Sequence, residues 1–406
     1  MWTILLLLLL GLVHGLAACL SDLDCSLNGL CTISTGICTC QSPWLGSNCG
    51  LLGTLPTTVG AAYGFGTPFE VSSWGGNAIY DNKTKLYHLY LSEMAGTGCG
   101  LHVWGFQSTV VHATSTTPGG SYTKQSTVIP AQAHNPHVIV YDGIYYIFHI
   151  GQGTGTATPA CNETGPGPFG PTTDQTSPSK TKDSVSHAHT VDGGSEIHQS
   201  SSPFGPFTPV ATSLPVCNNP SPFIHPNGTL FVACNNPPWS LHRSAGGPAG
   251  PWVTVATGLG SEEYWEDPFL WVDQNGYFHI LAHVWSPEPY PINPISAHTF
   301  SKDGVHWTAS PTQPYNNTVL RAGGTKQTFA TLERPKFLWA DPSDPFRPTH
   351  LFNGAAPYWG KGPDPCVACG PKGKANHCSY CKQASLANGD QANLDWSYTL
   401  VRPLHV

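Results

Sequence analysis

The chain has 406 residues, a net charge of −7 and only 10% charged residues, and no basic stripe runs along it. These values exclude nucleic acid as an expected partner, because proteins that bind nucleic acid gather Lys and Arg on one surface. Gly (44 residues) and Pro (38 residues) are abundant while apolar runs recur throughout. The composition is therefore typical of short strands joined by tight turns and excludes a disordered chain.

An apolar run opens the sequence. Residues 3–13 carry no charge and are apolar apart from Thr3 and Gly11, and small residues follow at Gly15 and Ala17. A run of this length is typical of a signal-peptide core and is short for a membrane span. We therefore predict a signal peptide over residues 1–17, no membrane span, and a secreted, extracellular protein. An uncleaved anchor is the alternative.

The cysteine and asparagine patterns agree with export. The 14 Cys predict disulfides, and Cys217 with Cys234, which flank one expected hairpin, are predicted to pair. Asn-x-Thr triplets predict a glycoprotein and lie at Asn82, Asn162, Asn227 and Asn316. Once Cys217 and Cys234 are paired, Cys99 and Cys161 are the cysteines that remain between the N-terminal and the late clusters. Two late C-x2-C pairs have a spacing that suits zinc, but export favours disulfides for Cys366, Cys369, Cys378 and Cys381.

Six cysteines fall within 31 residues near the N-terminus: Cys19, Cys25, Cys31, Cys38, Cys40 and Cys49. Their C-x-C-x8-C ending, with Trp44-Leu45-Gly46 in the last loop, resembles an EGF-like domain, here over residues 18–50. The resemblance implies the disulfides Cys19–Cys31, Cys25–Cys38 and Cys40–Cys49. A segment this short depends on such cross-links to fold. We expect an independent module that acts as a spacer or as a contact for extracellular proteins.

A weak repeat occurs five times between residues 58 and 406. Each unit has a polar opening, often followed by Pro, then an apolar strand, a polar turn and a second apolar strand, over residues 75–94, 134–151, 218–234, 266–283 and 333–354. A Ser-rich edge unit follows most of these hairpins. Four strands repeated five times predict an all-β, five-bladed β-propeller, with a β-sandwich as the alternative.

The blade pattern resembles the five-bladed propellers of glycoside hydrolase family 43 and its related families. The resemblance is clearest in the blade opening Trp265-Glu266-Asp267-Pro268-Phe269 and in the edge unit over residues 200–207. It implies cleavage of glycosidic bonds by carboxylates at the top of the innermost strands. The family expects Asp, Asp and Glu in blades one to three, where this chain has Asn77, Asn135 and Asn219. Because an amide cannot act as a general base, those roles cannot be transferred.

The repeat nevertheless predicts a site. First-strand starts and second-strand ends meet on one face of a propeller and form a funnel mouth. We predict catalytic roles for Glu93, Asp267 and Glu333, one of them kept ionised by Arg334 or His283. Hydrogen bonds within the protein are the alternative role for each polar residue, and core packing is the alternative for each Trp. The predicted substrate-binding residues are Trp74, Asn77, His134, Asn135, His149, Asn219, Asn235, Trp265, Glu266, His283 and Arg334.

We therefore interpret the chain as a secreted, glycoside hydrolase-like protein that acts on or binds a glycan in the funnel. No cofactor is required, although the funnel leaves room for a bound cation. The alternatives are a non-catalytic carbohydrate-binding propeller and a protein-interaction propeller in which the EGF-like module adds contact surface.

Overall fold

The computed structural model describes residues 19–58, 63, 71–96, 101, 104–157, 194–261, 265–284, 295–341, 343–356 and 397–405. The predicted signal peptide, Asn162, Cys99, Cys161 and the four late cysteines lie outside these residues. Among the described residues, no helix is long and apolar enough to cross a membrane.

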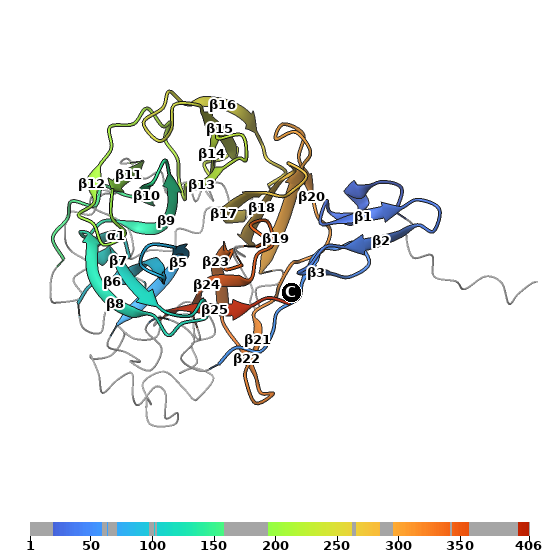
Figure 1. Ribbon diagram of the computed structural model, residues 1–406, viewed down its shortest axis with the longest axis horizontal. Helices are drawn as coiled ribbons and strands as arrows, with labels where there is room; N and C mark the ends of the chain where they lie inside the picture. The colour runs from blue at the N-terminus through green and yellow to red at the C-terminus, as the bar shows by residue number, and fades with distance from the viewer. Residues whose placement is uncertain are drawn as a thin grey trace, which may run out of the picture.

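Five antiparallel sheets stand around a central axis (Figure 1). Blade one contains β5 (Ser72–Asp81), β6 (Leu86–Met94), β7 (Ser108–Ser115) and β8 (Thr123–Ile129); blade two contains β9 (His134–Tyr141), β10 (Ile144–Ile150), β11 (Ser195–Ser200) and β12 (Thr208–Pro209); blade three contains β13 (Ser221–Ile224), β14 (Leu230–Cys234), β15 (Ser240–Ser244) and β16 (Val253–Thr257); blade four contains β17 (Trp265–Val272), β18 (Phe278–Val284), β19 (Ser296–Ser301) and β20 (Thr308–Ala309); and blade five contains β23 (Thr331–Leu338), β24 (His350–Ala356) and β25 (Tyr398–Pro403). The predicted all-β, five-bladed propeller is confirmed, and the sandwich alternative is wrong.

Small elements complete the fold. The N-terminal module has one turn of 3-10 helix, η1 (Asp22–Cys25), and the hairpin β1 (Gly29–Thr32) and β2 (Ile37–Cys40). β3 (Trp44–Leu45) pairs with β4 (Leu51–Leu52), and β21 (Thr318–Leu320) pairs with β22 (Lys326–Thr328). A short helix, α1 (Trp104–Gln107), precedes β7.

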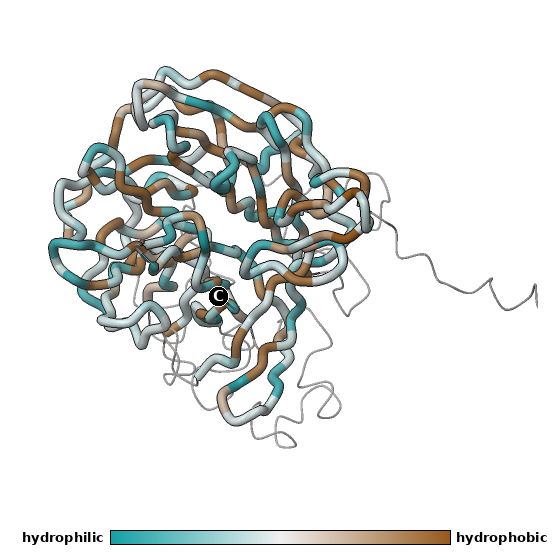
Figure 2. The backbone as a smooth tube through the Cα atoms, turned by 45° about the vertical axis from the view of Figure 1, so that its right-hand side comes forward, coloured by the Kyte–Doolittle hydropathy of each residue, from teal (hydrophilic) through white to brown (hydrophobic). Residues whose placement is uncertain are grey.

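The hydrophobic core is divided among the interfaces between neighbouring blades. Side chains from blades one and two form one cluster, which includes Val110 and Ile147, and a separate cluster fills each of the other four interfaces. Hydrophobic stretches accordingly recur around the whole ring (Figure 2). Each sheet buries both faces against its neighbours, as expected for the radial packing of a propeller.

The segment after the N-terminal module closes the ring. Thr54 and Tyr63 form antiparallel bridges to Leu404 and Thr399, at the free edge of β25. The Thr57 hydroxyl donates to the Val401 carbonyl at 2.8 Å. Blade five, which has three strands of its own, is therefore completed at its outer edge by an early part of the chain.

The disulfides implied by the EGF-like resemblance are confirmed: Cys19–Cys31, Cys25–Cys38 and Cys40–Cys49. The predicted Cys217–Cys234 bond, between the start of blade three and the end of β14, is confirmed as well. Each of these bonds closes a short loop, and in the N-terminal module the three together replace the large core that so few residues cannot form.

The N-terminal module packs against blade four instead of projecting as a spacer (Figure 1). The Trp44 ring stacks on His298, with centroids 5.1 Å apart, and on Trp271, at 6.2 Å. Asn48 Nδ2 donates to Thr312 Oγ1 at 2.9 Å. The module and the propeller therefore share one hydrophobic cluster.

Truncation of Trp44 to Ala is expected to lower the free energy of unfolding by about 3–5 kcal/mol, because it empties the centre of this shared cluster. Denaturant unfolding measures the change. Trp44→Phe should recover most of the loss, and Leu45→Ala, at a side chain that is 48% exposed, should have little effect. If Trp44→Ala has the same free energy of unfolding as the wild type, docking of the module adds nothing to stability.

Candidate functional site

One backbone feature recurs at the start of the innermost strand in every blade. The first hairpin loses register there in blades one, two, four and five, for example between Glu266 and Phe269. A residue with positive φ lies at that point in each blade: Gly75 (61°), Asn135 (51°), Asn219 (47°), Asp267 (56°) and Arg334 (53°). Left-handed backbone is unfavourable for residues other than Gly, and it gathers at functional sites. The loss of register is a β-bulge, and a β-bulge changes the direction in which these side chains point.

The shared register sorts the strand starts into three tiers. The upper tier is Trp74, His134, Asn218, Glu266 and Glu333. The middle tier is Gly75, Asn135, Asn219, Asp267 and Arg334. The lower tier is Asn77, His137, Ser221, Phe269 and Lys336. Asn77 therefore lies one tier below the position that the sequence repeat suggested, and Gly75 occupies that position in blade one.

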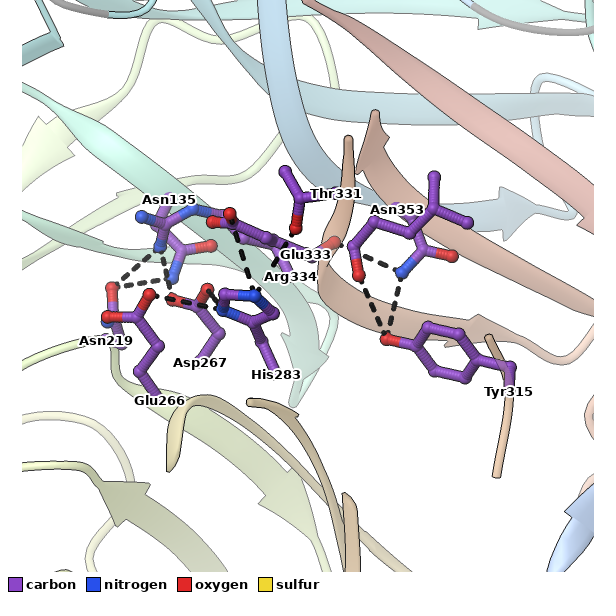
Figure 3. Close-up of polar contacts among 11 residues, drawn as sticks. Asn135, Asn219, Glu266, Asp267, His283, Tyr315, Thr331, Glu333, Arg334 and Asn353 are labelled. Atoms are coloured by element: carbon purple, nitrogen blue, oxygen red, sulfur yellow. Dashed lines mark hydrogen bonds and ion pairs between the residues drawn. The ribbon is translucent and has the colours of Figure 1, made fainter. Parts of the chain in front are cut away.

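The middle tier is joined across the ring by Arg334 (Figure 3). Its Nη1 donates to Asp267 Oδ1 at 2.6 Å and to Asn219 Oδ1 at 2.9 Å, and Asn135 Nδ2 donates to the same Asn219 oxygen at 2.8 Å. In blade one, a Cβ on Gly75 would come within 3.1 Å of the Arg334 side chain. Glycine there makes room for the arginine that links blades two to five.

Three carboxyl groups and one imidazole gather at the middle and upper tiers of blades four and five (Figure 3). His283 Nδ1 lies 3.2 Å from Glu266 Oε1 and 3.9 Å from Asp267 Oδ2, and its Nε2 lies 3.6 Å from Glu333 Oε1. The Glu266 side chain is 38% exposed, while those of Asp267 and Glu333 are 0% and 6% exposed. Glu266 is therefore the carboxyl group that faces solvent most openly.

The cluster separates the protonation states of its members. Burial is the largest cause that raises the pKa of Glu333; His283 and Arg334 lower it, Glu266 and Asp267 raise it, and the sum is a pKa of about 7. Burial alone would lower the pKa of His283, but Glu333, Glu266 and Asp267 outweigh it and raise that pKa to about 9. Burial also raises the pKa of Asp267, against the pull of Arg334. A pKa near neutral pH suits Glu333 to proton transfer, and the neighbouring His283 stays protonated there.

The same four residues could hold a metal ion. Glu266, Asp267, His283 and Glu333 each offer one ligand atom, and these atoms lie within 4.8 Å of one another. Asp267 Oδ2 and Glu333 Oε1 are buried without a hydrogen-bond partner among the described residues. A donor set of three carboxylate oxygens and one nitrogen suits a hard divalent cation. The residues therefore fit the cation for which the sequence left room.

Glu93, predicted as catalytic, does not join this cluster. Its carboxylate accepts hydrogen bonds from the Tyr63 hydroxyl and, at 2.5 Å, from Lys124 Nζ on the outermost strand β8. The reason is a register difference of one residue: Ser92 pairs with Trp74 as His283 pairs with Glu266. Because side chains alternate along a strand, Glu93 points to the other face.

His149, predicted to bind substrate, also points away from the axis. Ile150 is the residue that pairs with His134, so His149 points into blade two, where its Nε2 lies 2.9 Å from His198 Nδ1. Asn77 bonds both backbone groups of Val138 with its side-chain amide, and so fixes blade two to blade one. These two predicted substrate-binding residues therefore serve the packing of the blades.

The two predicted sugar-stacking tryptophans also pack within the protein. Trp74 is 1% exposed, and its ring occupies the space above Gly354, where a Cβ would come within 2.6 Å of it. Trp265 packs against the cluster between blades three and four. Trp74 is therefore a core residue, which is the alternative given above to a role in substrate binding.

Polar atoms without partners remain on the other side of the ring. His134 Nδ1 lies 2.8 Å from Ser108 Oγ, but its Nε2 has no hydrogen-bond partner among the described residues, and neither have Asn135 Oδ1 and Asn235 Oδ1. All three side chains are buried. They remain able to bond a ligand.

The sequence reasoning missed one central residue, Lys336. It lies in the lower tier of blade five and is 1% exposed. The sequence contains a signal for this residue, because a lone Lys inside the apolar run Pro335–Trp339 is unusual for a buried strand.

The site and the fold define a five-bladed β-propeller with a carboxyl cluster at its axis. Solved structures that the chain is similar to include a thermostable family-43 glycoside hydrolase, with 10% identity, a TM-score of 0.48, and coverage of 87% of this chain and 93% of that one. A family 117 glycoside hydrolase from the marine bacterium Zobellia galactanivorans has 12% identity, a TM-score of 0.46, and coverage of 87% and 89%. An endo-arabinase from Bacteroides thetaiotaomicron has 13% identity, a TM-score of 0.45, and coverage of 87% and 98%.

No protein-family model matches the sequence, and no curated protein matches it. We therefore base the functional proposal on the residues of this chain.

Proposed function

We propose that the protein is a glycoside hydrolase whose reacting groups are Glu333 and Glu266. The observation that carries this proposal is the pair itself: two carboxyl groups in equivalent upper-tier positions of neighbouring blades, one buried and one partly exposed. Glycoside hydrolysis needs two carboxyl groups that differ in pKa and flank the scissile bond.

Each residue then has a defined role. Glu333, whose burial raises its pKa to about 7, donates a proton to the leaving oxygen. Glu266 acts as the carboxylate, and His283 Nδ1 donates to it at 3.2 Å. Asp267 does not touch the substrate. It anchors Arg334 at 2.6 Å and adds negative charge that helps to keep Glu333 protonated.

The spacing of the pair favours retention of configuration. One oxygen of Glu266 and one of Glu333 lie no more than 4.8 Å apart, which is below the ~6.5–9.5 Å typical of inverting enzymes and leaves the roughly 5–5.5 Å of retaining enzymes as the closer match. Glu266 would bond the anomeric carbon as Glu333 protonates the departing oxygen. Glu333 would then take a proton from the water that releases the sugar.

Export and glycosylation belong to the same proposal. The four disulfides described above suit an oxidising, extracellular setting. Three Asn-x-Thr acceptors, Asn82, Asn227 and Asn316, are exposed next to turns. We infer that the mature protein is secreted and carries N-linked glycans.

A screen on aryl glycosides and polysaccharides tests the enzymatic proposal. The wild-type protein is expected to release sugar from one of them, and NMR of the first product should show retained anomeric configuration. Glu266→Gln should lose turnover while the substrate still binds. Release of sugar with inverted configuration would contradict the role of Glu266.

A carbohydrate-binding protein without catalysis is the second candidate. It is favoured by His134 Nε2, Asn135 Oδ1 and Asn235 Oδ1, which are buried groups able to bond sugar hydroxyls. Glycan-array binding without turnover on any bound glycan would support this candidate against the first.

A further inference from the structure

Lys336 is a buried lysine without an ion pair among the described residues. It lies in β23 and is 1% exposed. Its Nζ makes no hydrogen bond in the described part of the chain and lies over the ring of Phe269, 5.9 Å from the centroid. Burial of an ion without a partner costs several kcal/mol, so this arrangement needs an explanation.

The lower tier around Lys336 contains no carboxylate. The His137 ring stacks on Phe269, with centroids 5.5 Å apart, and Asn77 is bonded to Val138. Ser221 Oγ accepts the Leu270 N–H at 2.8 Å and lies 3.4 Å from His137 Nδ1. The Ser221 hydroxyl can then donate to Nδ1, which leaves Nε2 of His137 as an N–H donor.

The carboxylate that acts on Lys336 is Asp267, one tier above, and it is already ion-paired with Arg334 at 2.6 Å. Lys336 therefore has no carboxylate of its own in the lower tier. Burial lowers the pKa of Lys336 to about 7, with Asp267 opposing and Arg334 adding to the effect, and burial together with Lys336 lowers the pKa of His137.

We propose that a single monovalent anion of halide size binds beside Lys336 in the lower tier and serves as its counter-ion. A small, weakly hydrated anion matches one ammonium group and one neutral imidazole N–H. Sulfate or phosphate would need more donors than these side chains supply. This site is separate from the carboxyl cluster and does not depend on the proposed hydrolase activity.

Thermal unfolding of the full chain at neutral pH tests the proposal. Bromide or chloride replaces gluconate at constant ionic strength. The midpoint should rise by about 3–4 °C when the halide reaches roughly 100 times its dissociation constant. Lys336→Met should abolish this rise. Lys302→Met, at an exposed lysine that also lies over an aromatic ring, Tyr277, should keep it.

Two results would overturn the proposal: a wild-type midpoint indifferent to halide, or the same rise in Lys336→Met. A measurement on the wild-type protein covers the case in which Lys336→Met does not fold. Crystals soaked in bromide should show an anomalous peak next to Lys336 Nζ. A soak at saturating bromide that gives no such peak would exclude the site.

Discussion

Replacement of Glu333 by Gln is expected to lower the turnover of the glycoside substrate by a factor of about 10²–10⁴, the usual contribution of general acid catalysis. The amide keeps the shape of the side chain but has no acidic proton to transfer. Steady-state kinetics on an aryl glycoside measure the effect, and the loss should be smallest for leaving groups that need no protonation.

The pH dependence gives the same residue a second test. Because burial raises the pKa of Glu333 to about 7, the wild-type rate should fall as the pH rises above 7 and the acid loses its proton. This alkaline limb should vanish in Glu333→Gln, whose residual rate no longer depends on that proton.

Glu93→Gln is the matched control. It makes the same chemical change at a carboxylate bonded to Tyr63 and Lys124, outside the cluster, so turnover should stay near the wild-type value. A Glu333→Gln enzyme as active as the wild type, or a Glu93→Gln enzyme as inactive as Glu333→Gln, would place the chemistry elsewhere.

The second large effect is acid unfolding between about pH 5 and 6. Nine buried histidines have a pKa that burial lowers below the ordinary value: His88, His112, His134, His137, His149, His198, His242, His279 and His298. In the unfolded chain they bind protons below about pH 6.5. Their contribution to stability is therefore complete above that pH and is lost as the pH falls.

The size of the effect follows from linkage. The five whose pKa burial lowers furthest are His112, His134, His137, His149 and His298. Each of these loses about 1.4 kcal/mol at one pH unit below the unfolded pKa, so the five together lose about 7 kcal/mol near pH 5.5. That sum is comparable to the whole stability of a folded domain, about 5–15 kcal/mol. Glu333 and Asp267 act in the opposite direction, because burial raises the pKa of both and the free energy of unfolding that they contribute rises as the pH falls. Two carboxyl groups offset only part of the loss from the buried imidazoles.

Denaturant unfolding at a series of pH values measures this slope. His112→Phe, in a ring that stacks on Tyr90, should reduce the slope by about one proton. His405→Phe is the control, because His405 is exposed at the surface, and this variant should keep the wild-type slope. A cooperative, native fold that persists well below pH 5 would contradict the prediction.

The fold could be predicted because its signals are local. Alternating strands around tight turns repeat five times, and the C-x-C-x8-C ending with its aromatic loop resembles an EGF-like domain, a resemblance that implies the disulfide pairs of the module. Cys217 and Cys234 likewise stand at the two ends of one hairpin. None of these inferences needs knowledge of contacts between distant parts of the chain.

Which residues face the candidate site depends on the strand register to within one residue, and the sequence repeat does not define the register that finely. Glu93 and His149 each lie one residue from the strand position that faces the axis, and a shift by one residue reverses the direction of a side chain. The bulges that set this register occupy different distances from the polar openings in blade one and in blade four. Docking of Trp44 on Trp271 joins segments more than half the chain apart, and no local pattern reports such a contact.

The closure of the ring has a consequence for the order of events during synthesis. Thr57 bonds Val401, 344 residues further along the chain. The hairpins of blades one to four can form as each leaves the ribosome, because their strands are consecutive. Blade five has to wait with its early edge segment unpaired until the last strand has emerged. Until then the nascent chain carries an open ring with two unpaired sheet edges, the stage at which it is most exposed to misassociation with another copy.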